Sequence, residues 1–447
     1  MGKESQVFRL ESWLLNFAYA TLILIASPWI VWSAIRHGKY REGFGEKFLG
    51  RVPLRVDSRT CIWLHAVSVG EVNLLQTTLN ELRTRLPNAE FVISTTTKTG
   101  YDLACKKYAD QTVFYCPLDF SWAVRNAWQR VRPDMLVLAE LELWPNLIRL
   151  ANQRGTKVTI INGRLSDNSF RGYRRFRPLV SRLLNHIDLV AAQNEETAAR
   201  FLALGAKDVQ VSGSLKFDGA VTDRQNERTQ ALCELAGFDP DDVVFLAGST
   251  QAPEEKYALE IFQRLSQQHP TLRLVLVPRH PERFDEVAHL LDESGEVWTR
   301  RSSLITPPSA LHPPPSVLLV DTIGELGAWW GTASLGLVGG SFGSRGGQNM
   351  LEPATYGVAT CFGPNTKNFR DIVAQLLAVD GAKVVQDQTE FEEFVVRALD
   401  DPNWATAMGS RAQNLVLSQQ GATQRTVDLL LPLVSSHQSQ VTKTQAA

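Results

Sequence analysis

Several short motifs in this chain place a glycine turn beside a charged side chain, directly after a run that predicts a β-strand. In His65-Ala-Val-Ser-Val-Gly70-Glu71, Gly70 permits a tight turn into a helix whose first turn contains Glu71. A carboxylate at this position can simply complement the helix dipole. It can also act as a general base, provided that partial desolvation or bound substrate offsets the lowering of its pKa by the dipole.

A glycine-rich segment later in the chain indicates an anion-binding loop. Five glycines lie within residues 339–347, after an apolar run and before a helix start. Backbone N–H groups in such a loop can cradle an anion. Glu352, in the first turn of the following helix, can accept hydrogen bonds from ribose hydroxyls, or it can complement the helix dipole.

Arg279, in the segment Val277-Pro278-Arg279-His280-Pro281, offers a planar fork to a phosphate or a carboxylate. A surface arginine fixed between two prolines fits the same sequence equally well. Other glycine turns at predicted strand or loop ends carry polar side chains in a similar way; they are Gly248-Ser249-Thr250, Gly213-Ser214-Leu215-Lys216 and Gly324-Glu325.

Several common classes of site lose support from the sequence. It contains no GxGxxG after a predicted strand, no GxxxxGK[ST] and no HExxH, which disfavours a dinucleotide dehydrogenase, a P-loop NTPase and a zincin. The five cysteines are widely spaced and form no CxxC pair, so we expect a reducing compartment and no metal site. A formal net charge of -1 gives no general attraction to nucleic acid, and we predict no nucleic-acid partner.

The elements that must position these motifs form two series. The chain has 447 residues, of which 44% are hydrophobic, enough for two substantial cores. Apolar runs alternate with amphipathic helical segments, such as residues 71–86, and this alternation predicts parallel sheets buried on both faces. The expected strands are 61–69, 90–97, 112–116, 134–139, 157–162, 189–193 and 209–214 in the first series, and 243–247, 272–277, 317–320, 335–338 and 359–362 in the second.

The predicted fold class is therefore α/β, with two Rossmann-like, doubly wound domains that face a cleft between the carboxyl ends of their sheets. We expect an N-terminal anchor over residues 1–37, a first domain over 38–215 and a second over 216–434. The second domain includes a proline-rich loop at 306–315 and terminal helices near 390–399 and 403–417. A polar tail, predicted to fray, covers residues 435–447.

The anchor is predicted from residues 12–35, a stretch of 24 residues without a charge. A helix of this length can span a bilayer, and it is too long and too aromatic for the core of a signal peptide. Basic residues follow it between positions 36 and 55, which places the remainder of the chain in the cytoplasm by the positive-inside rule. A buried or interfacial helix is the alternative.

A second surface for membrane contact is predicted between residues 164 and 182. Six arginines there are interleaved with aromatic residues, and Asp167 is the one acid among them. Such a segment suits anionic lipid or a phosphorylated headgroup. RNA, or simply solvent, would fit the same charge pattern.

Taken together, these motifs resemble the 3-deoxy-D-manno-octulosonic acid (Kdo) transferases, membrane-associated enzymes of the lipopolysaccharide inner core. The resemblance runs from the anchor to about residue 380. It rests on many short motifs in a fixed order, none of them specific alone. Besides those above, they are Thr95-Thr-Thr-Lys-Thr-Gly100, Glu140-Leu-Glu142-Leu-Trp-Pro-Asn146, Asn162-Gly-Arg164-Leu-Ser166, Gly213-Ser-Leu-Lys216-Phe-Asp218 and Asn349-Met-Leu-Glu352-Pro353.

The resemblance implies a GT-B glycosyltransferase that moves Kdo from CMP-Kdo to a hydroxyl of a phosphorylated lipid A precursor, with inversion and without a cofactor or metal. Glu71 matches the catalytic base. Gly70, Glu140, Glu142 and Arg164 fall on the acceptor side, in the first domain. The residues that match the donor site are Lys216, Ser249, Arg279, His280, Gly324, Glu325, Gly340, Ser341, Asn349 and Glu352. The family also implies the bacterial inner membrane, single-pass or monotopic, with the catalytic domains on its cytoplasmic face.

Three positions depart from the family pattern, which usually has His at Gln251 and Gln348 and Gly at Pro253. Glutamine can donate a hydrogen bond but cannot carry a positive charge. Two alternatives stay open on the sequence: a GT-B transferase that uses a UDP-sugar, and a membrane-tethered adaptor that binds a phosphorylated glycolipid without catalysis.

Overall fold

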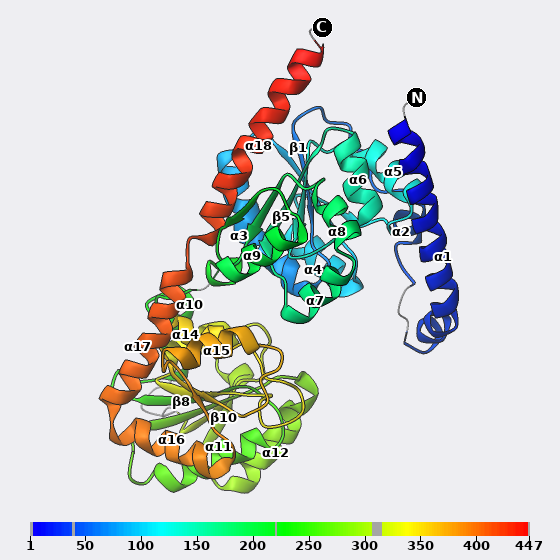
Figure 1. Ribbon diagram of the computed structural model, residues 1–447. Helices are drawn as coiled ribbons and strands as arrows, with labels where there is room; N and C mark the ends of the chain where they lie inside the picture. The colour runs from blue at the N-terminus through cyan, green and yellow to red at the C-terminus, as the bar shows by residue number, and fades with distance from the viewer. Residues whose placement is uncertain (1–2, 38–40, 220, 306–314, 446–447) are drawn as a thin grey trace. The chain divides into compact units, whose positions relative to one another are not determined.

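The computed structural model describes residues 3–37, 41–219, 221–305 and 315–445. The chain divides into two compact units (Figure 1), one comprising Met1–Gly219 with Gln420–Ala447 and the other Ala220–Gln419. Residues 306–314 of the predicted proline-rich loop lie outside the described residues.

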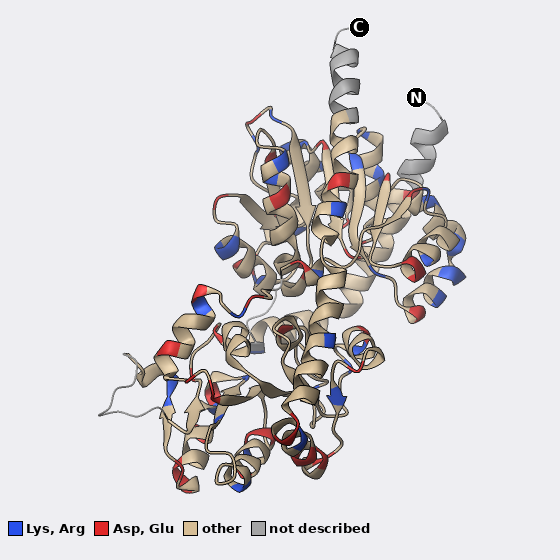
Figure 2. Ribbon diagram, turned by 90° about the vertical axis from the view of Figure 1, so that its left-hand side faces the viewer, with Lys and Arg blue, Asp and Glu red and all other residues tan. Residues whose placement is uncertain are grey.

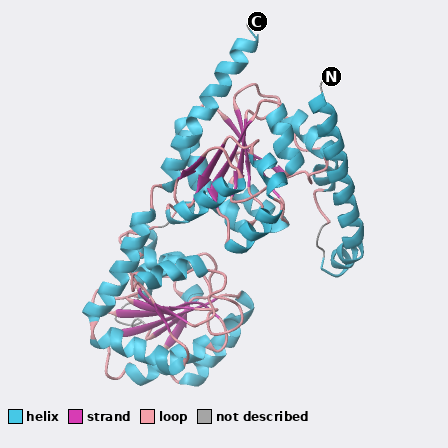
Figure 3. Cartoon of the chain, viewed as in Figure 1, coloured by secondary structure: helices cyan, strands magenta, loops and turns pink. Residues whose placement is uncertain are grey.

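The first unit contains a parallel sheet in the order β3-β2-β1-β4-β5-β6-β7. Apart from β7 and the start of β3, its strands are almost wholly buried, as apolar strands covered by helices on both faces should be (Figure 3). The strands are β1 (Cys61–His65), β2 (Glu90–Thr95), β3 (Thr112–Tyr115), β4 (Met135–Ala139), β5 (Lys157–Gly163), β6 (Leu189–Ala192) and β7 (Val209–Val211). The helices are α2 (Phe44–Leu49), α3 (Val69–Arg85), α4 (Lys98–Lys107), α5 (Ser121–Val131), α6 (Pro145–Gln153), α7 (Asp167–Arg175), α8 (Arg177–Leu184) and α9 (Glu195–Leu204).

The second unit repeats this plan with a parallel sheet in the order β10-β11-β9-β8-β12-β13-β14. Its strands are β8 (Val243–Thr250), β9 (Leu272–Pro278), β10 (Trp298–Arg300), β11 (Val317–Leu319), β12 (Leu335–Val338), β13 (Ala359–Phe362) and β14 (Lys383–Val384). Its helices are α10 (Glu227–Ala236), α11 (Glu254–Leu265), α12 (Phe284–Ser294), α13 (Leu326–Thr332), α14 (Leu351–Thr355), α15 (Arg370–Ala378), α16 (Gln388–Asp400) and α17 (Pro402–Gln419). The predicted α/β class with two doubly wound sheets is confirmed.

Each sheet has one point at which the strand order reverses. In the first unit it lies between β1 and β4, and in the second between β8 and β12. Ligands of open parallel sheets bind beside the carboxyl ends of strands at such a point. The segment that contains Glu71 follows β1, and the segment that contains Glu142 follows β4. The fold therefore places two of the predicted motifs on either side of the reversal point of the first sheet.

The C-terminal helix differs from the prediction that residues 216–434 belong to the second domain. Helix α18 (Ala422–Gln445) is part of the first unit. Its apolar residues Ala422, Val427, Leu430 and Val434 are buried in the same core as the inner face of α3. Asp218 accepts hydrogen bonds from backbone N–H groups at the start of this helix. The segment predicted to fray, residues 435–447, continues α18 as far as Gln445.

The N-terminal segment forms helix α1 (Lys3–His37), longer than the predicted stretch 12–35. Within it, Glu11–Arg36 is long and apolar enough to cross a membrane, the one such helix among the described residues. Large apolar side chains on α1 are exposed; Trp13, for example, retains 74% of its accessible surface. Polar side chains attach the helix to the first unit: Tyr19 donates to Asp119, and Asn16 and Ser121 exchange hydrogen bonds.

Candidate active site

Glu71 is held in place by the first turn of its own helix. Ser68 is the N-cap of α3, and its hydroxyl accepts the backbone N–H of Glu71. The Ser68 hydroxyl donates to Glu71 Oε1 at 2.9 Å, and the N–H of Val67 donates to Oε2 at 2.8 Å. This reciprocal arrangement follows from a serine three residues before a glutamate at a helix start. The Glu71 side chain is therefore fixed, with 9% of the residue exposed.

Glu71 belongs to a cluster of three carboxylates. Burial raises the pKa of Glu71, and the charge of Glu140 raises it further, while the N–H of Val67 and the Ser68 hydroxyl oppose the rise. Burial and the charge of Glu71 raise the pKa of Glu142 to about 7, although the indole N–H of Trp144 donates to Glu142 Oε2 at 3.0 Å. Glu140 has a φ of +58°, a strained conformation that is typical of functional sites. The structure thus brings Glu71, Glu140 and Glu142 together.

His65, for which the sequence predicted no role, packs against Trp144, the residue that donates to Glu142. His65 is fully buried at the end of β1, and burial lowers its pKa to about 4, so the ring is neutral. Its Nδ1 lies 2.8 Å from the Ser94 hydroxyl, which also accepts the indole N–H of Trp63. The ring packs edge-on to Trp144, with centroids 6.1 Å apart. The only signal in the sequence was the place of His65 at the start of the Glu71 motif.

The two remaining acceptor-side residues are exposed. Gly70 lies beside Glu71 in α3, and Arg164 directly follows β5. The adjacent helices α7 and α8 carry the predicted basic segment, and Phe176 within it retains 62% of its accessible surface. This segment therefore combines exposed cations with exposed apolar surface. Elsewhere, charges of both signs are spread over the two units (Figure 2).

In the second unit, three predicted donor-site residues lie together. The Asn349 side chain donates to Glu352 Oε1 at 3.0 Å. Burial raises the pKa of Glu352, and the amide of Asn349 and the positive charge of Arg279 oppose this rise. Arg279 is exposed just beyond the end of β9. Nearby, Ser249 at the end of β8 has a φ of +55°, a second strained residue at a predicted binding position.

The glycine-rich loop differs in one respect from the predicted anion cradle. The backbone N–H groups of Gly340, Ser341 and Phe342 all donate to the carboxylate of Glu254. The Ser341 hydroxyl donates to the carbonyl of Val338 and accepts the N–H of Gly363. These groups of Gly340 and Ser341 therefore bond within the protein and determine the shape of the loop. Glu254 was not among the residues predicted from the sequence.

The other predicted donor residues are scattered. Glu325 forms a bidentate ion pair with Arg301, with contacts of 2.9 and 3.0 Å, and Gly324 is exposed with a φ of +89°. His280 lies 3.8 Å from the carboxylate of Glu282. Lys216 is exposed in a 3₁₀ turn of the first unit, so the unit that carries the other donor candidates does not contain it.

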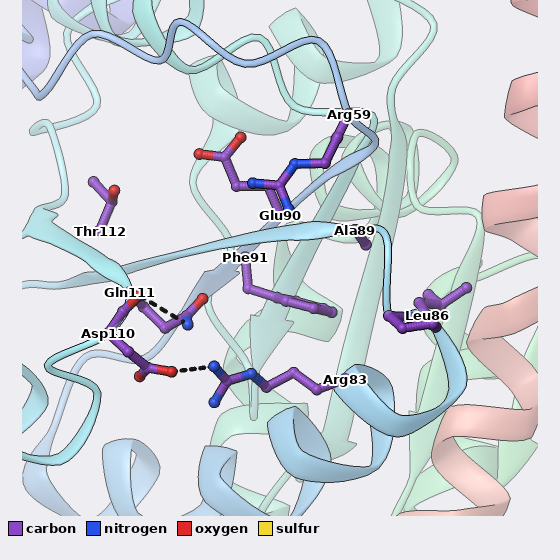
Figure 4. Close-up of a pocket in the computed structure, with 10 residues that line it drawn as sticks. Arg59, Arg83, Leu86, Ala89, Glu90, Phe91, Asp110, Gln111 and Thr112 are labelled. Carbon is purple, nitrogen blue, oxygen red and sulfur yellow. Dashed lines mark hydrogen bonds and ion pairs between the residues drawn. The ribbon is translucent and has the colours of Figure 1, made fainter.

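A cavity of about 430 Å³ lies elsewhere in the first unit (Figure 4). It is lined by residues at the amino ends of β2 and β3, among them Glu90 and Thr112, and by the ion pair between Arg83 and Asp110. Because the strands are parallel, this edge of the sheet is opposite the one that carries Glu71. Among the described residues, no group of three or more acidic, histidine or cysteine side chains could hold a metal ion.

Replacement of Ser68 with alanine tests how Glu71 is held. The variant loses the N-cap of α3 and the hydroxyl that donates to Glu71 Oε1. We expect a loss of about 1 kcal/mol in the free energy of unfolding, measured with urea, because that is typical of a missing N-cap. Thr84→Ala, in the last turns of the same helix, should cost less. Equal costs for the two variants would contradict the capping role.

Comparisons with known proteins identify the family to which the chain belongs. A profile of 3-deoxy-D-manno-octulosonic-acid transferases matches residues 39–219. The chain is 30% identical over 425 residues to the 3-deoxy-D-manno-octulosonic acid transferase of Haemophilus influenzae, covering 93% of this chain and 98% of that one. It is 32% identical over 415 residues to the transferase of the same description from Bordetella pertussis, covering 90% and 94%. A glycosyltransferase structure from Rickettsia africae has a TM-score of 0.54 at 10% identity, covering 85% of this chain and 99% of that one.

The two doubly wound sheets, together with the likeness to a solved glycosyltransferase, define a GT-B glycosyltransferase fold. The chain belongs to the 3-deoxy-D-manno-octulosonic acid (Kdo) transferase family. It is therefore a glycosyltransferase, as the sequence motifs predicted.

Proposed function

We propose that this protein transfers Kdo from CMP-Kdo to a hydroxyl of a phosphorylated lipid A precursor during synthesis of the lipopolysaccharide inner core. The observation that carries the proposal is the fixed, buried carboxylate of Glu71 at the reversal point of the first sheet, beside Glu140 and Glu142. A carboxylate that is held in place, and whose pKa is raised, suits a general base better than a mere dipole partner.

In this proposal, Glu71 accepts the proton of the acceptor hydroxyl as that oxygen attacks the anomeric carbon of Kdo. The bond to the phosphate of CMP breaks, and the configuration at the anomeric carbon inverts. Negative charge develops on the departing CMP, where Arg279 stabilises it. Glu352, oriented by Asn349, accepts hydrogen bonds from the ribose hydroxyls. No step requires a metal ion.

The remaining donor assignments rest on the family pattern and on the positions of the residues. Ser249, near the end of β8, and Gly324, just before α13, both have positive φ. Gly324 has no side chain, so the backbone there can approach a ligand closely. Gly340 and Ser341 contribute through the shape of the glycine-rich loop. Three further residues are also proposed to contact the donor: Lys216, His280 and Glu325.

The acceptor side of the proposal uses the basic segment between residues 164 and 182, beginning at Arg164. Its exposed arginines suit the phosphates of the acceptor, and its exposed Phe176 suits the acyl region of a membrane. Helix α1 anchors the protein in the bacterial inner membrane, single-pass or monotopic. By the positive-inside rule, the basic residues that follow α1 favour an orientation with the catalytic units on the cytoplasmic face.

Deletion of residues 1–36 tests the anchor. We expect the truncated protein to move from the membrane pellet to the soluble fraction after cell lysis, because the exposed apolar surface of α1 is removed. CMP binding should persist, since all of its proposed contacts except Lys216 lie in the other unit. If the truncated protein stays in the pellet but is released by high salt, the basic segment is a second attachment and α1 is not the dominant one.

Replacement of Glu140 with glutamine tests the base through pH. The base must be deprotonated, so kcat/KM falls as pH falls through the pKa of Glu71. The negative charge of Glu140 raises that pKa, and its removal should lower it. We therefore expect the acidic limb of the pH profile to shift to lower pH in Glu140→Gln, with no shift in Glu81→Gln on the outer part of α3. A shift in the opposite direction would contradict the assignment.

Competition between nucleotides tests the donor. CMP should inhibit transfer and bind the isolated protein, whereas UDP at the same concentration should do neither. Preference for UDP would favour a UDP-sugar transferase.

A substitution of Glu71 tests the adaptor alternative. If the protein were a non-catalytic adaptor, the Glu71→Ala variant should keep its biological role in cells. If the protein is an enzyme, the variant should lose that role.

A further inference from the structure

We infer that the consecutive carboxylates Glu254 and Glu255 are positioning residues that lock together the two loops proposed to bind the donor. The inference rests on the proposed function of those loops. The loops are residues 339–347, after β12, and residues 279–283, after β9. Both carboxylates lie in the first turn of α11, the helix that follows β8.

Glu254 holds the glycine-rich loop. Its Oε2 accepts the N–H groups of Gly340 and Gln251, both at 2.8 Å, and its Oε1 accepts those of Ser341 at 2.9 Å and Phe342 at 3.1 Å. The residue is 1% exposed. Burial raises the pKa of Glu254, and the four N–H groups oppose the rise. A buried carboxylate is costly unless it is bonded in this way, so the loop and Glu254 stabilise each other.

Close approach explains a glycine in this loop. A Cβ on Gly339 would lie 2.7 Å from Glu254 Oε2 and 2.6 Å from the Cα of Thr250. A larger residue would therefore push the loop away from the carboxylate. The glycine-rich composition predicted a loop that binds an anion. Part of that composition is explained by the Glu254 carboxylate, an anion of the protein itself.

Glu255 holds the other loop. It is also 1% exposed, and it forms an ion pair with the guanidinium of Arg283. Arg283 ends the short 3₁₀ turn Pro281–Arg283, which directly follows Arg279 and His280. On its outer side, Arg283 pairs with Glu286 at 2.9 Å, a contact open to solvent. The buried partner, Glu255, therefore supplies most of the restraint on the position of this turn.

The sheet order shows why one helix start can reach both loops. Strand β8 lies between β9 and β12, and α11 begins directly after it. The two loops emerge from the strands on either side of β8. Two adjacent glutamates at the start of α11 consequently set the position of Arg279 relative to the glycine-rich loop. Neither glutamate needs to touch the donor.

Binding of CMP to the full-length protein tests this inference. We expect Glu254→Gln and Glu255→Gln each to weaken CMP binding about tenfold or more in calorimetry, because a glutamine amide cannot accept four N–H groups or pair with Arg283. Glu286→Gln, which removes only the exposed partner of Arg283, and Glu293→Gln, an exposed residue of α12, should bind CMP like the parent protein. Glu254→Asp, which keeps the charge, should show a smaller loss.

Unchanged CMP binding in Glu254→Gln and Glu255→Gln would overturn the inference. Tighter binding in Glu254→Gln would also overturn it, since Glu254 would then be a competitor for the phosphate. Hydrogen exchange without ligand gives a separate readout: amides 340–342 should exchange faster in Glu254→Gln than in Glu293→Gln, and equal rates would contradict the role of Glu254. If the parent protein does not bind CMP, the proposed donor site fails, while the exchange comparison still decides whether Glu254 holds the loop.

Discussion

Glu71→Gln is expected to reduce the transfer of Kdo by about 10² to 10⁴-fold, the range of a lost general base. Glutamine keeps the size of the side chain. Its amide oxygen can still accept the N–H of Val67 while its NH2 group donates to the Ser68 hydroxyl, so the first turn of α3 should remain formed. It cannot take up a proton from the acceptor hydroxyl. The measurement is the initial rate of labelled Kdo transfer at saturating CMP-Kdo.

The matched control for this prediction is Glu81→Gln. Glu81 lies on the same helix but near its C-terminal end, where it pairs with Arg85 at the surface. It should transfer Kdo at the parental rate, and both variants should bind CMP equally. A Glu71→Gln variant that retained most of its activity would remove Glu71 from the chemistry and leave it as a capping residue.

Arg279→Ala is expected to raise the KM for CMP-Kdo and to lower kcat as well, with kcat/KM falling by about 10² to 10³-fold. We expect a large change because the guanidinium is proposed to bind the phosphate. This interaction strengthens as negative charge develops on the departing CMP. The substitution also removes the cation that lowers the pKa of Glu352, so the ribose contact should weaken too.

Steady-state kinetics with CMP-Kdo as the varied substrate measure this effect. Arg264→Ala is the control, because Arg264 pairs with Glu392 on the surface of the same unit. If Arg279→Ala changed neither parameter, Arg279 would be a surface residue held between prolines, the other interpretation that its sequence allowed.

Much of the fold could be predicted because buried parallel strands are continuous apolar runs. The cores of β1, β4, β9 and β12 were located in this way. Strands β10 and β14 were not predicted, because they are short, lie at the two edges of the second sheet and contain polar residues such as Arg300 and Lys383. Their pairing depends on neighbours that are distant in sequence, which a local pattern cannot reveal.

The assignment of the C-terminal helix failed for a related reason. The apolar stripe of α18 predicts that one face of the helix is buried. It does not show against which of the two sheets that face packs. Its position after α17 suggested the second domain. Contacts with α3 and with Asp218, more than two hundred residues earlier, decided otherwise.

Residues of the candidate site could be proposed from the sequence where a charged side chain lies within a motif. Glu142 and Arg279 follow strands β4 and β9, whereas Glu71 and Glu352 lie in the first turns of helices α3 and α14. All four are residue types that can act as a base or bind a polar ligand. Supporting residues are harder to find. Glu254 lies in an unremarkable helix start, and its role emerges only when the fold places it under the glycine-rich loop, 86 residues further along the chain.

The most direct test of the account is transfer of labelled Kdo from CMP-Kdo, generated in place, to a bisphosphorylated lipid A precursor by the full-length protein. The account predicts a labelled product whose mass exceeds that of the precursor by whole Kdo units and whose formation depends on Glu71. A folded protein that binds CMP but transfers no Kdo to this acceptor would contradict the proposed reaction, and attention would then turn to Gln251 and Gln348, where the family pattern has histidine.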